Sequence, residues 1–195
     1  MKHKSQSVSK LSRNDADAIA DARVRKTRKK IDEAFVKMLF DRSYQNLRVS
    51  DVTRKAAIGR ATFYAHFSSK DALLKTQVNR IVIPMLKASP GSPFLVDCRA
   101  LFAHVRAAPQ LFRAIMSKGE GSGSHVVRDA MEVWLDELLP PQKPIVGRLP
   151  AALVKRFLVS TLVTIITHGL QPGVTDSAEA MQNQFEKLVG SGLSG

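Results

Sequence analysis

Apolar residues recur at helical spacing along much of the chain, beginning near residue 31. The first stripe consists of Ile31, Ala34, Phe35, Met38 and Leu39. This order is typical of one buried helix face, and Thr27 is the expected cap at its start. Residues 1–22 lack this periodicity and are rich in Ser, Lys and Asp. We therefore predict that residues 1–22 are a disordered basic tail.

Two short helices are predicted next, separated by a tight break. Ser50 is expected to cap a helix over about 50–56, because a serine hydroxyl can accept a hydrogen bond from the first turn. Ala57-Ile58-Gly59 interrupts the pattern, and the following helix is expected to begin at Arg60. Three short helices with such a break before the third predict a helix-turn-helix.

A fourth helix is predicted from the next apolar stripe. Ser68 or Ser69 is expected to cap it, and it should run to about Lys87 with a kink at Pro84. The Pro- and Gly-rich stretch 89–93 follows as a linker.

The rest of the chain also has helical rather than alternating patterns. Helices are expected over 94–107, 109–117, 125–139, 150–168 and from a cap at Asp176 onward. We predict an all-α fold of about nine helices. Its parts would be the tail 1–22, a helix-turn-helix domain over 23–70, and a helical ligand-binding and dimerisation domain over 71–195.

Positive charge is concentrated in the N-terminal part. The chain of 195 residues has a net charge of +13, and residues 1–80 contribute +11 of it through 19 Lys and Arg against 8 Asp and Glu. Such segregation favours a polyanion partner for this part, whereas a solubility role would not explain it.

Several function classes lack support in the sequence. Cys98 is the single cysteine, so neither an intrachain disulfide nor a zinc finger is expected. The three central histidines have no metal-ligand spacing, and no catalytic constellation or phosphate-binding glycine loop is found. We expect no metal, no cofactor and no enzyme activity. With no signal peptide and no apolar run long enough for a bilayer, we expect a cytoplasmic protein without a membrane partner.

The segment 58–70 carries the most specific chemistry. Phe63 and Phe67 are four residues apart and share one helix face, which predicts that both are buried. Polar side chains that can donate hydrogen bonds occupy the other faces. A helix with this division is suited to lie against a phosphate backbone or in a groove of DNA.

Residues 27–75 resemble the DNA-binding domain of the tetracycline-repressor (TetR) family. The resemblance is carried by 34–35, 49–52, 56–67 and 69–74, and it covers about a quarter of the chain. The family architecture implies a helix-turn-helix DNA-binding domain followed by a helical ligand-binding and dimerisation domain.

The chain departs from the family pattern near the turn. Ala57 stands where glycine is usual, and a left-handed residue there would cost about 1 kcal/mol. Gly59 and Ala61 replace a common serine and a common glycine. Arg48 takes the place of a threonine, so it would itself have to supply that phosphate contact.

The resemblance implies a set of DNA-binding residues. Arg60 and Ala61 would face base edges, and arginine is the commonest reader of guanine. The remaining contacts would be to phosphates, with His66 alternatively only holding the helix in place. The full set is Arg48, Ser50, Arg60, Ala61, Thr62, Tyr64, His66 and Lys70. The basic arm over 23–30 would follow the backbone or enter a minor groove, the alternative being a solvated charge run.

The C-terminal half suggests a dimer and a pocket. The helix over 150–168 is apolar around most of its circumference, which favours burial on two sides, one of them against a second copy; the alternative is one large monomeric core. The candidate dimer residues are Phe157, Leu158, Thr161, Leu162, Ile165, Met181, Phe185 and Leu188. The candidate pocket residues, which are otherwise core, are Phe94, Phe102, Phe112, Met116, Met131 and Trp134.

These observations lead to one function and two alternatives. We expect a homodimeric repressor that binds a near-palindromic double-stranded DNA operator and is released by an unidentified small-molecule effector. The alternatives are a helical small-molecule-binding protein without a DNA role, and a nonspecific binder of polyanions or membrane surfaces.

Overall fold

The computed structural model describes residues 13–89, 96–117, 121–138 and 149–193. These residues form nine α-helices, and the all-α prediction is confirmed. The helices are α1 (Arg13–Asp41), α2 (Val49–Ala56), α3 (Arg60–His66), α4 (Lys70–Gln77), α5 (Arg99–Ala107), α6 (Pro109–Ile115), α7 (Ser124–Leu138), α8 (Ala151–Gly169) and α9 (Ala178–Leu193).

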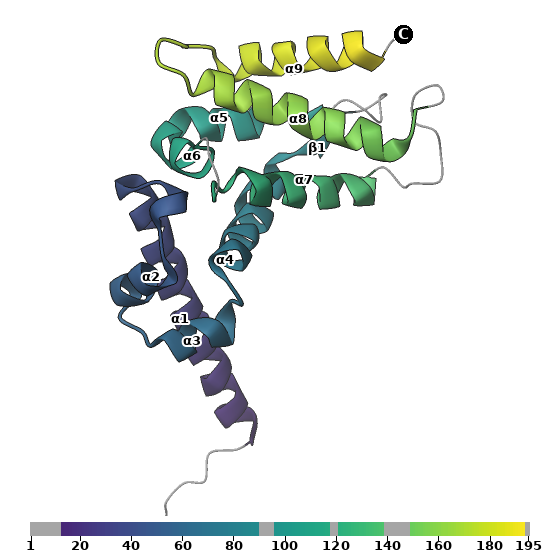
Figure 1. The fold of residues 1–195 in the computed structure, drawn as a ribbon. Helices are drawn as coiled ribbons and strands as arrows, with labels where there is room; N and C mark the ends of the chain where they lie inside the picture. The colour runs from purple at the N-terminus through teal and green to yellow at the C-terminus, as the bar shows by residue number, and fades with distance from the viewer. Residues whose placement is uncertain (1–12, 90–95, 118–120, 139–148, 194–195) are drawn as a thin grey trace, which may run out of the picture.

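The helices form two units joined through α4 (Figure 1). The first three helices make the lower unit, and α1 extends beyond α3 toward the N-terminus. In the upper unit, α8 and α9 lie side by side, with α9 outermost and α5 to α7 beneath them. The recognition-helix candidate α3 and the α8–α9 layer are therefore at opposite ends of the molecule.

The first helix is much longer than predicted. The expectation of a disordered tail is wrong for residues 13–22, which form the first turns of α1, while residues 1–12 lie outside the described residues. Thr27 is not a cap, because its Oγ1 donates to the Arg23 carbonyl 2.9 Å away inside the helix. Alanine is the strongest helix former and occupies every second position from 16 to 22, so propensity rather than burial favours this part.

Two predicted helix caps are also corrected. Helix α2 begins at Val49, and the Asp51 carboxylate accepts from the Arg48 N–H at 3.1 Å, so Ser50 lies inside the first turn. At the last helix, the Ser177 hydroxyl accepts from the Ala180 N–H at 3.1 Å. Asp176 instead accepts from the Gln184 side chain at 2.8 Å. At α2 the Asp51 side chain thus reaches back to the residue before the helix, whereas at α9 the Ser177 side chain reaches forward into the first turn.

The predicted fourth helix changes its winding before it ends. Helix α4 begins at Lys70 with Ser69 accepting from the Ala72 N–H, as expected. It stops at Gln77 and continues as the π-helical segment η2 (Val78–Val82) and the 3₁₀ turn η3 (Ile83–Met85). Proline lacks an N–H and its ring clashes with the carbonyl four residues earlier, so Pro84 explains the wider turn before it.

The chain then forms a short strand pair that the pattern did not predict. Strands β1 (Lys87–Ala88) and β2 (Val96–Asp97) pair antiparallel, with Lys87 opposite Asp97. The prediction that a helix begins at 94 is wrong, since α5 begins at Arg99. Gln182 holds this junction from α9, accepting from the Cys98 N–H at 2.8 Å and donating to the Val96 carbonyl at 3.0 Å.

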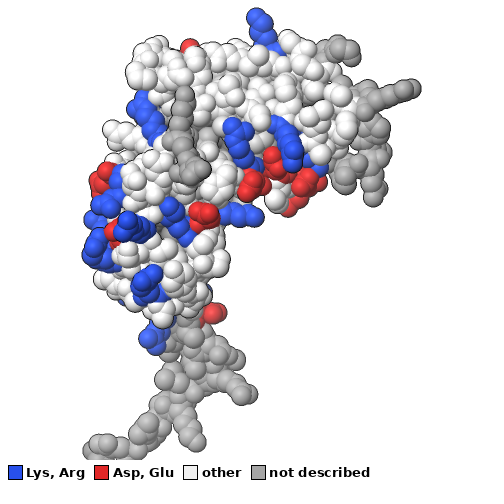
Figure 2. All heavy atoms as spheres, in the orientation of Figure 1, with Lys and Arg blue, Asp and Glu red and all other residues white. Residues whose placement is uncertain are grey.

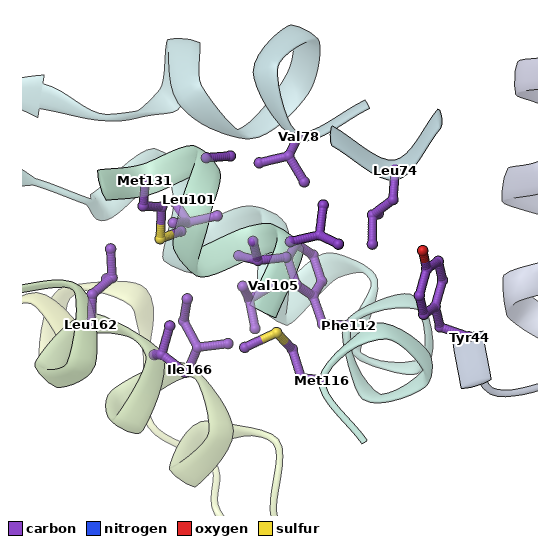
Figure 3. Packing of buried hydrophobic residues seen from close by; sticks show 14 of the residues in the cluster. Tyr44, Leu74, Val78, Leu101, Val105, Phe112, Met116, Met131, Leu162 and Ile166 are labelled. Carbon is purple, nitrogen blue, oxygen red and sulfur yellow. The ribbon is translucent and has the colours of Figure 1, made fainter. Parts of the chain in front are cut away.

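One apolar core runs through both units (Figure 3). Tyr44, on the 3₁₀ turn η1 (Tyr44–Asn46), and Leu74 of α4 lie at one end of the view. Phe112 of α6 lies between them and the residues of α7 and α8, including Met131 and Leu162. The two units therefore share a continuous buried surface.

A buried polar cluster adds a second link between α1 and α4. Asp32 is 6% exposed, and Gln77 donates to its Oδ1 at 2.6 Å. Arg80 lies 3.0 Å from the other carboxylate oxygen and donates to the Gln77 carbonyl oxygen at 2.6 Å. Since the buried carboxylate has both an amide and a guanidinium partner, its charge is compensated.

Helix α8 is long and apolar enough to cross a bilayer by length and composition alone. Half of its apolar window is buried inside the protein, as for the core helix of a globular domain.

The conformation of Ala57 leads to a stability prediction. Ala57 is exposed with φ 52° and ψ 51°, the left-handed region expected from its place in the turn. We expect Ala57→Gly to raise the free energy of unfolding by about 1 kcal/mol, because glycine has no Cβ to strain there. Urea denaturation measures this change. Ala65→Gly, on the exposed face of α3, is the matched control and should lower stability by about 1 kcal/mol. A loss of stability in both variants would contradict the prediction.

Candidate nucleic-acid interface

The turn between α2 and α3 is closed by backbone hydrogen bonds. The Ala57 N–H donates to the Arg54 carbonyl at 3.2 Å, and the Ile58 N–H donates to the Thr53 carbonyl at 3.1 Å. Gly59 is extended, and a Cβ built there would meet only the Thr62 hydroxyl at 3.8 Å. The turn therefore depends on the left-handed residue 57, whereas position 59 has room for a larger cap.

Helix α3 is fixed by its two aromatic residues. Phe63 is 0% exposed and Phe67 is 4% exposed, as predicted, with ring centroids 5.8 Å apart. Arg60, Ala61 and Thr62 are exposed, and Tyr64 is 49% exposed with its ring edge-on to Phe63. The outer face of α3 is thus polar and accessible, while its inner face is rigidly held.

The other predicted contacts differ in accessibility. Arg48 and Ser50 are exposed at the start of α2. His66 is only partly exposed, and its ring lies 6.4 Å from that of Phe67. Its surroundings fit a supporting role for α3 as well as an outward contact.

Lys70 has an internal role that the sequence did not indicate. Its Nζ donates to the Tyr44 carbonyl at 2.8 Å and lies 4.1 Å from the centroid of the Tyr44 ring. Burial lowers the pKa of Lys70, opposed by the negative charge of Asp71. Tyr44 also donates its hydroxyl to Asp71, and burial followed by that hydrogen bond raises the Tyr44 pKa. Lys70 therefore ties η1 to the start of α4, which leaves only its remaining N–H groups for a phosphate.

The N-terminal extension of α1 adds a basic surface beside α3. Arg28 lies over the ring of Phe67, its guanidinium carbon 5.1 Å from the centroid. Arg25 precedes it by three residues, shares its side of the helix and is exposed. Figure 2 shows Lys and Arg gathered over the N-terminal helices, while most of the α8–α9 layer on this face is uncharged. The alanine-rich stretch 16–22 was the signal that these bases lie on a helix.

The predicted apolar pocket is filled in this structure. Met131 and Trp134 line a cavity of only about 10 Å³, space for about one water molecule. Phe102 and Phe112 are buried elsewhere in the core, while Met116 lies beside two hollows at the end of α6. Phe94 lies outside the described residues. The predicted residues therefore do not surround one common pocket.

Most of the predicted dimer residues face the protein's own interior. Leu158, Thr161, Leu162, Ile165, Met181 and Phe185 are buried in this single chain. They therefore cannot form the outer face of the chain as folded, and that part of the prediction is corrected. Phe157 is half-buried, and Leu188 is 52% exposed. The exposed stripe of α8 runs instead through Leu153 and His168.

Among the residues that the structure describes, no group of three His, Cys, Asp or Glu side chains is arranged to hold a metal ion. Burial raises the pKa of Cys98, so its thiol stays protonated.

The chain is similar in sequence to known bacterial regulatory proteins. Residues 32–76 match the family of bacterial regulatory proteins called tetR. The HTH-type transcriptional regulator YxbF of Bacillus subtilis is 26% identical over 176 residues, which cover 87% of this chain and 46% of YxbF. The chain spans about half the length of the curated relatives it matches, 46% of one and 58% of another.

Solved structures share the fold. A TetR transcriptional regulator from Streptococcus agalactiae 2603V has a TM-score of 0.59 at 21% identity, with 89% of this chain and 98% of that chain covered. The dihydroxyacetone kinase operon activator DhaS has a TM-score of 0.53 at 19% identity, with 86% and 96% covered. The matched segment contains the α2–turn–α3 unit and its buried aromatic pair, so residues 32–76 form a helix-turn-helix segment of the tetR family of bacterial regulatory proteins.

Proposed function

We propose that the chain is a transcriptional regulator that binds a near-palindromic DNA operator as a homodimer and responds to a small molecule. The observation that carries this proposal is the polar outer face of α3 above the buried Phe63 and Phe67 pair. That face lies in the part of the chain that holds +11 of the net charge of +13. Rigid support and positive charge are what binding in the major groove requires.

In this proposal α3 enters the major groove and α2 lies across the backbone. Arg60, at the first position of α3, would read a base edge, with Ala61 beside it. Thr62 and Tyr64 would donate to phosphates, and Arg48 and Ser50 would add contacts at the start of α2. Lys70 and His66 would act mainly by holding α3 and α4 in place, given their internal contacts.

The helical extension of α1 would run along the backbone rather than enter a minor groove. An α-helix is about 10–12 Å wide with its side chains, whereas the minor groove of B-DNA is about 6 Å wide. Arg25 and Arg28 are on the side of α1 that faces the end of α3, so they are the bases best placed for phosphates.

The outer face of α8 and α9 is the proposed dimer surface. Leu153 and Leu188 are 55% and 52% exposed, and large apolar side chains at such exposure favour a protein partner. Phe157 is half-buried beside Gly192 on this face. A symmetric dimer would present two α3 helices to half-sites about 34–36 Å apart.

The direction of regulation and the effector are separate questions. One structural relative is described as an operon activator, so binding by this chain need not mean repression. The cavity among Met131, Trp134 and their described neighbours has space for only about one water molecule, so an effector would need another site or a repacked core. Binding to DNA would make the cytoplasm its place of action.

The competing function is nonspecific binding of polyanions, which is favoured only by the net positive charge.

Selection of duplexes from a random pool tests operator binding. We expect one near-palindrome to be enriched, with affinity at least about a thousandfold above random duplex. Arg60→Ala should weaken the free energy of operator binding by about 1–3 kcal/mol and relax the preference at one base pair in each half-site. Tyr64→Phe should weaken binding to every duplex by about 1 kcal/mol. Lys87→Ala, which removes one charge on β1, is the control and should leave the binding affinity unchanged. Equal affinity for all duplexes would favour the competing function.

The salt dependence of operator affinity tests the helical extension. Replacing both Arg25 and Arg28 with Gln should reduce the slope of log affinity against log salt by about 2 for each half-site. Fluorescence anisotropy at several salt concentrations measures this slope. Lys37→Gln, on the same helix but in its packed half, is the control. An unchanged slope in the double variant would remove the extension from the interface.

Sedimentation at low micromolar concentration tests the dimer. The unmodified chain should be dimeric, and replacing both Leu153 and Leu188 with Glu should give monomers, because carboxylates would be buried at the apolar contact. Val133 on α7 is similarly exposed at 49%, so Val133→Glu is the matched control and should stay dimeric. A monomeric unmodified chain, or a dimeric double variant, would reject this surface.

A further inference from the structure

Two adjoining hollows open between the end of α6, the turn before α7 and the C-terminal half of α8. Their volumes are about 300 Å³ and about 530 Å³, and they share Met116, Ser117 and Thr167. Small-molecule sites usually occupy at least about 300 Å³. These hollows thus have the size that the apolar core lacks.

Hydroxyl groups dominate the smaller hollow. Its polar lining consists of Ser117, Ser122, Ser124, Arg128, Thr164 and Thr167. The two threonines donate to carbonyls of their own helix, which leaves their oxygens as acceptors. Ser122 and Ser124 share one hydrogen bond at 2.8 Å, so one of these hydroxyls still has a proton to donate. A ligand with several hydroxyls could match these groups.

Two features of the lining call for an acceptor. The Ser117 hydroxyl oxygen is buried and has no hydrogen-bond partner among the residues that the structure describes. Arg128 makes only a 3.3 Å bond to the Ser160 hydroxyl, and no described carboxylate pairs with it. A guanidinium has five N–H donors, so most of those on Arg128 have no partner among the described residues. Arg113 lines the adjoining hollow and adds a second positive charge.

We propose that this hollow, named here the hydroxyl groove, binds a small hydroxylated oxyanion as the effector of this regulator. Arg128 would pair with its carboxylate or phosphate, and the buried Ser117 hydroxyl would donate to one of its oxygens. This inference rests on the proposed function only in calling the ligand an effector; the binding itself does not depend on DNA.

Contacts lead from the hydroxyl groove to the DNA-binding unit. His125 Nδ1 lies 2.8 Å from the Ser122 carbonyl, to which it donates. His125 Nε2 lies 3.4 Å from Asp71 on α4. Asp71 in turn accepts from the Tyr44 hydroxyl, and Lys70 donates to the Tyr44 carbonyl. A shift of the Ser122 backbone would therefore reach the start of α4.

Close packing makes that shift hard to absorb locally. A Cβ built on Gly123 would lie 2.8 Å from side-chain atoms of both Leu74 and Ile115. The Gly123 N–H also donates to the Ile115 carbonyl at 2.8 Å. Because the turn has no free space on the side of α4, an occupant that displaces it must move α4 or be excluded.

Titration calorimetry on the full-length protein without DNA tests the binding. The probes are D-gluconate for a carboxylate and glycerol 3-phosphate for a phosphate, with sorbitol and glycerol as their uncharged counterparts and sulfate as an anion without hydroxyls. We expect saturable binding of at least one hydroxylated oxyanion with a Kd below about 1 mM, and none of sorbitol, glycerol or sulfate. No saturable binding of either oxyanion, or equal binding of the uncharged counterparts, would overturn the proposal.

Variants assign that binding to the hydroxyl groove. Arg128→Gln should weaken it at least about tenfold, and Ser117→Ala about fivefold. Lys87→Gln removes the same charge outside the groove and should leave it unchanged. Thermal unfolding checks that each variant is folded, and Ser117→Ala remains informative if Arg128→Gln is not. Unchanged affinity in the folded groove variants would place the ligand elsewhere and overturn the assignment.

Anisotropy with the selected duplex tests the coupling. The bound probe should change operator affinity about 5–150-fold, and His125→Ala should bring that ratio close to one while the probe still binds free protein. If the bound probe changes the operator affinity of His125→Ala as much as that of the unmodified protein, the coupling does not run through the His125 contacts. If no duplex is bound specifically while the probe binds through Arg128, the proposed function fails and the site stands. If the duplex is bound specifically and neither probe binds, the proposed function stands and the ligand site fails.

Discussion

The buried face of α4 is the constraint on which the two units depend. Leu73 and Leu74 are 0% and 1% exposed, and they belong to the same apolar core as Phe35 of α1 and Phe112 of α6. Since protein interiors are close-packed, α4 cannot tilt without repacking neighbours on both sides. The three N-terminal helices therefore take their orientation from the C-terminal unit through α4 and through the direct packing of α1 and η1 on α6.

The winding of the chain after α4 limits where such a tilt can arise. Gln77 is anchored to the buried Asp32 of α1, and the π-helical turns begin at the next residue. Pro84 cannot complete the regular hydrogen-bond pattern, so the winding widens over 78–82, yet Arg80 in this segment still bonds to Asp32. The change of winding therefore begins beside the attachment to α1.

The sequence predicted some features well because a local pattern determines them. The spacing of Phe63 and Phe67 fixed the inner face of α3, and the break at residues 57–59 marked its start. The all-α architecture followed in the same way, whereas the left-handed conformation of Ala57 was suggested only by the family resemblance. Residue roles in DNA contact remain predictions, since exposure of a side chain does not identify its partner.

Other features depend on tertiary contacts that periodicity does not contain. A helix that is apolar nearly all round does not indicate which side turns inward, so Leu162 and Phe185 were assigned to a dimer surface although both are buried in the chain's own core. The internal role of Lys70 depends on Tyr44, which lies 26 residues away in sequence. Residues 21–26 of α1 are all exposed and form no apolar stripe, so the alanine content just before them was the local feature that favoured a helix.

The continuity of α1 has a mechanical consequence. Its 29 residues form a rod about 43 Å long, of which the part before Arg28, the contact with Phe67, extends about 22 Å further. A rotation of about 10° at this contact would move the tip by about 4 Å, most of the length of one helical turn. Small angular changes near Arg28 are thereby magnified with distance, and the bases farthest from this contact would lose register with a phosphate backbone first.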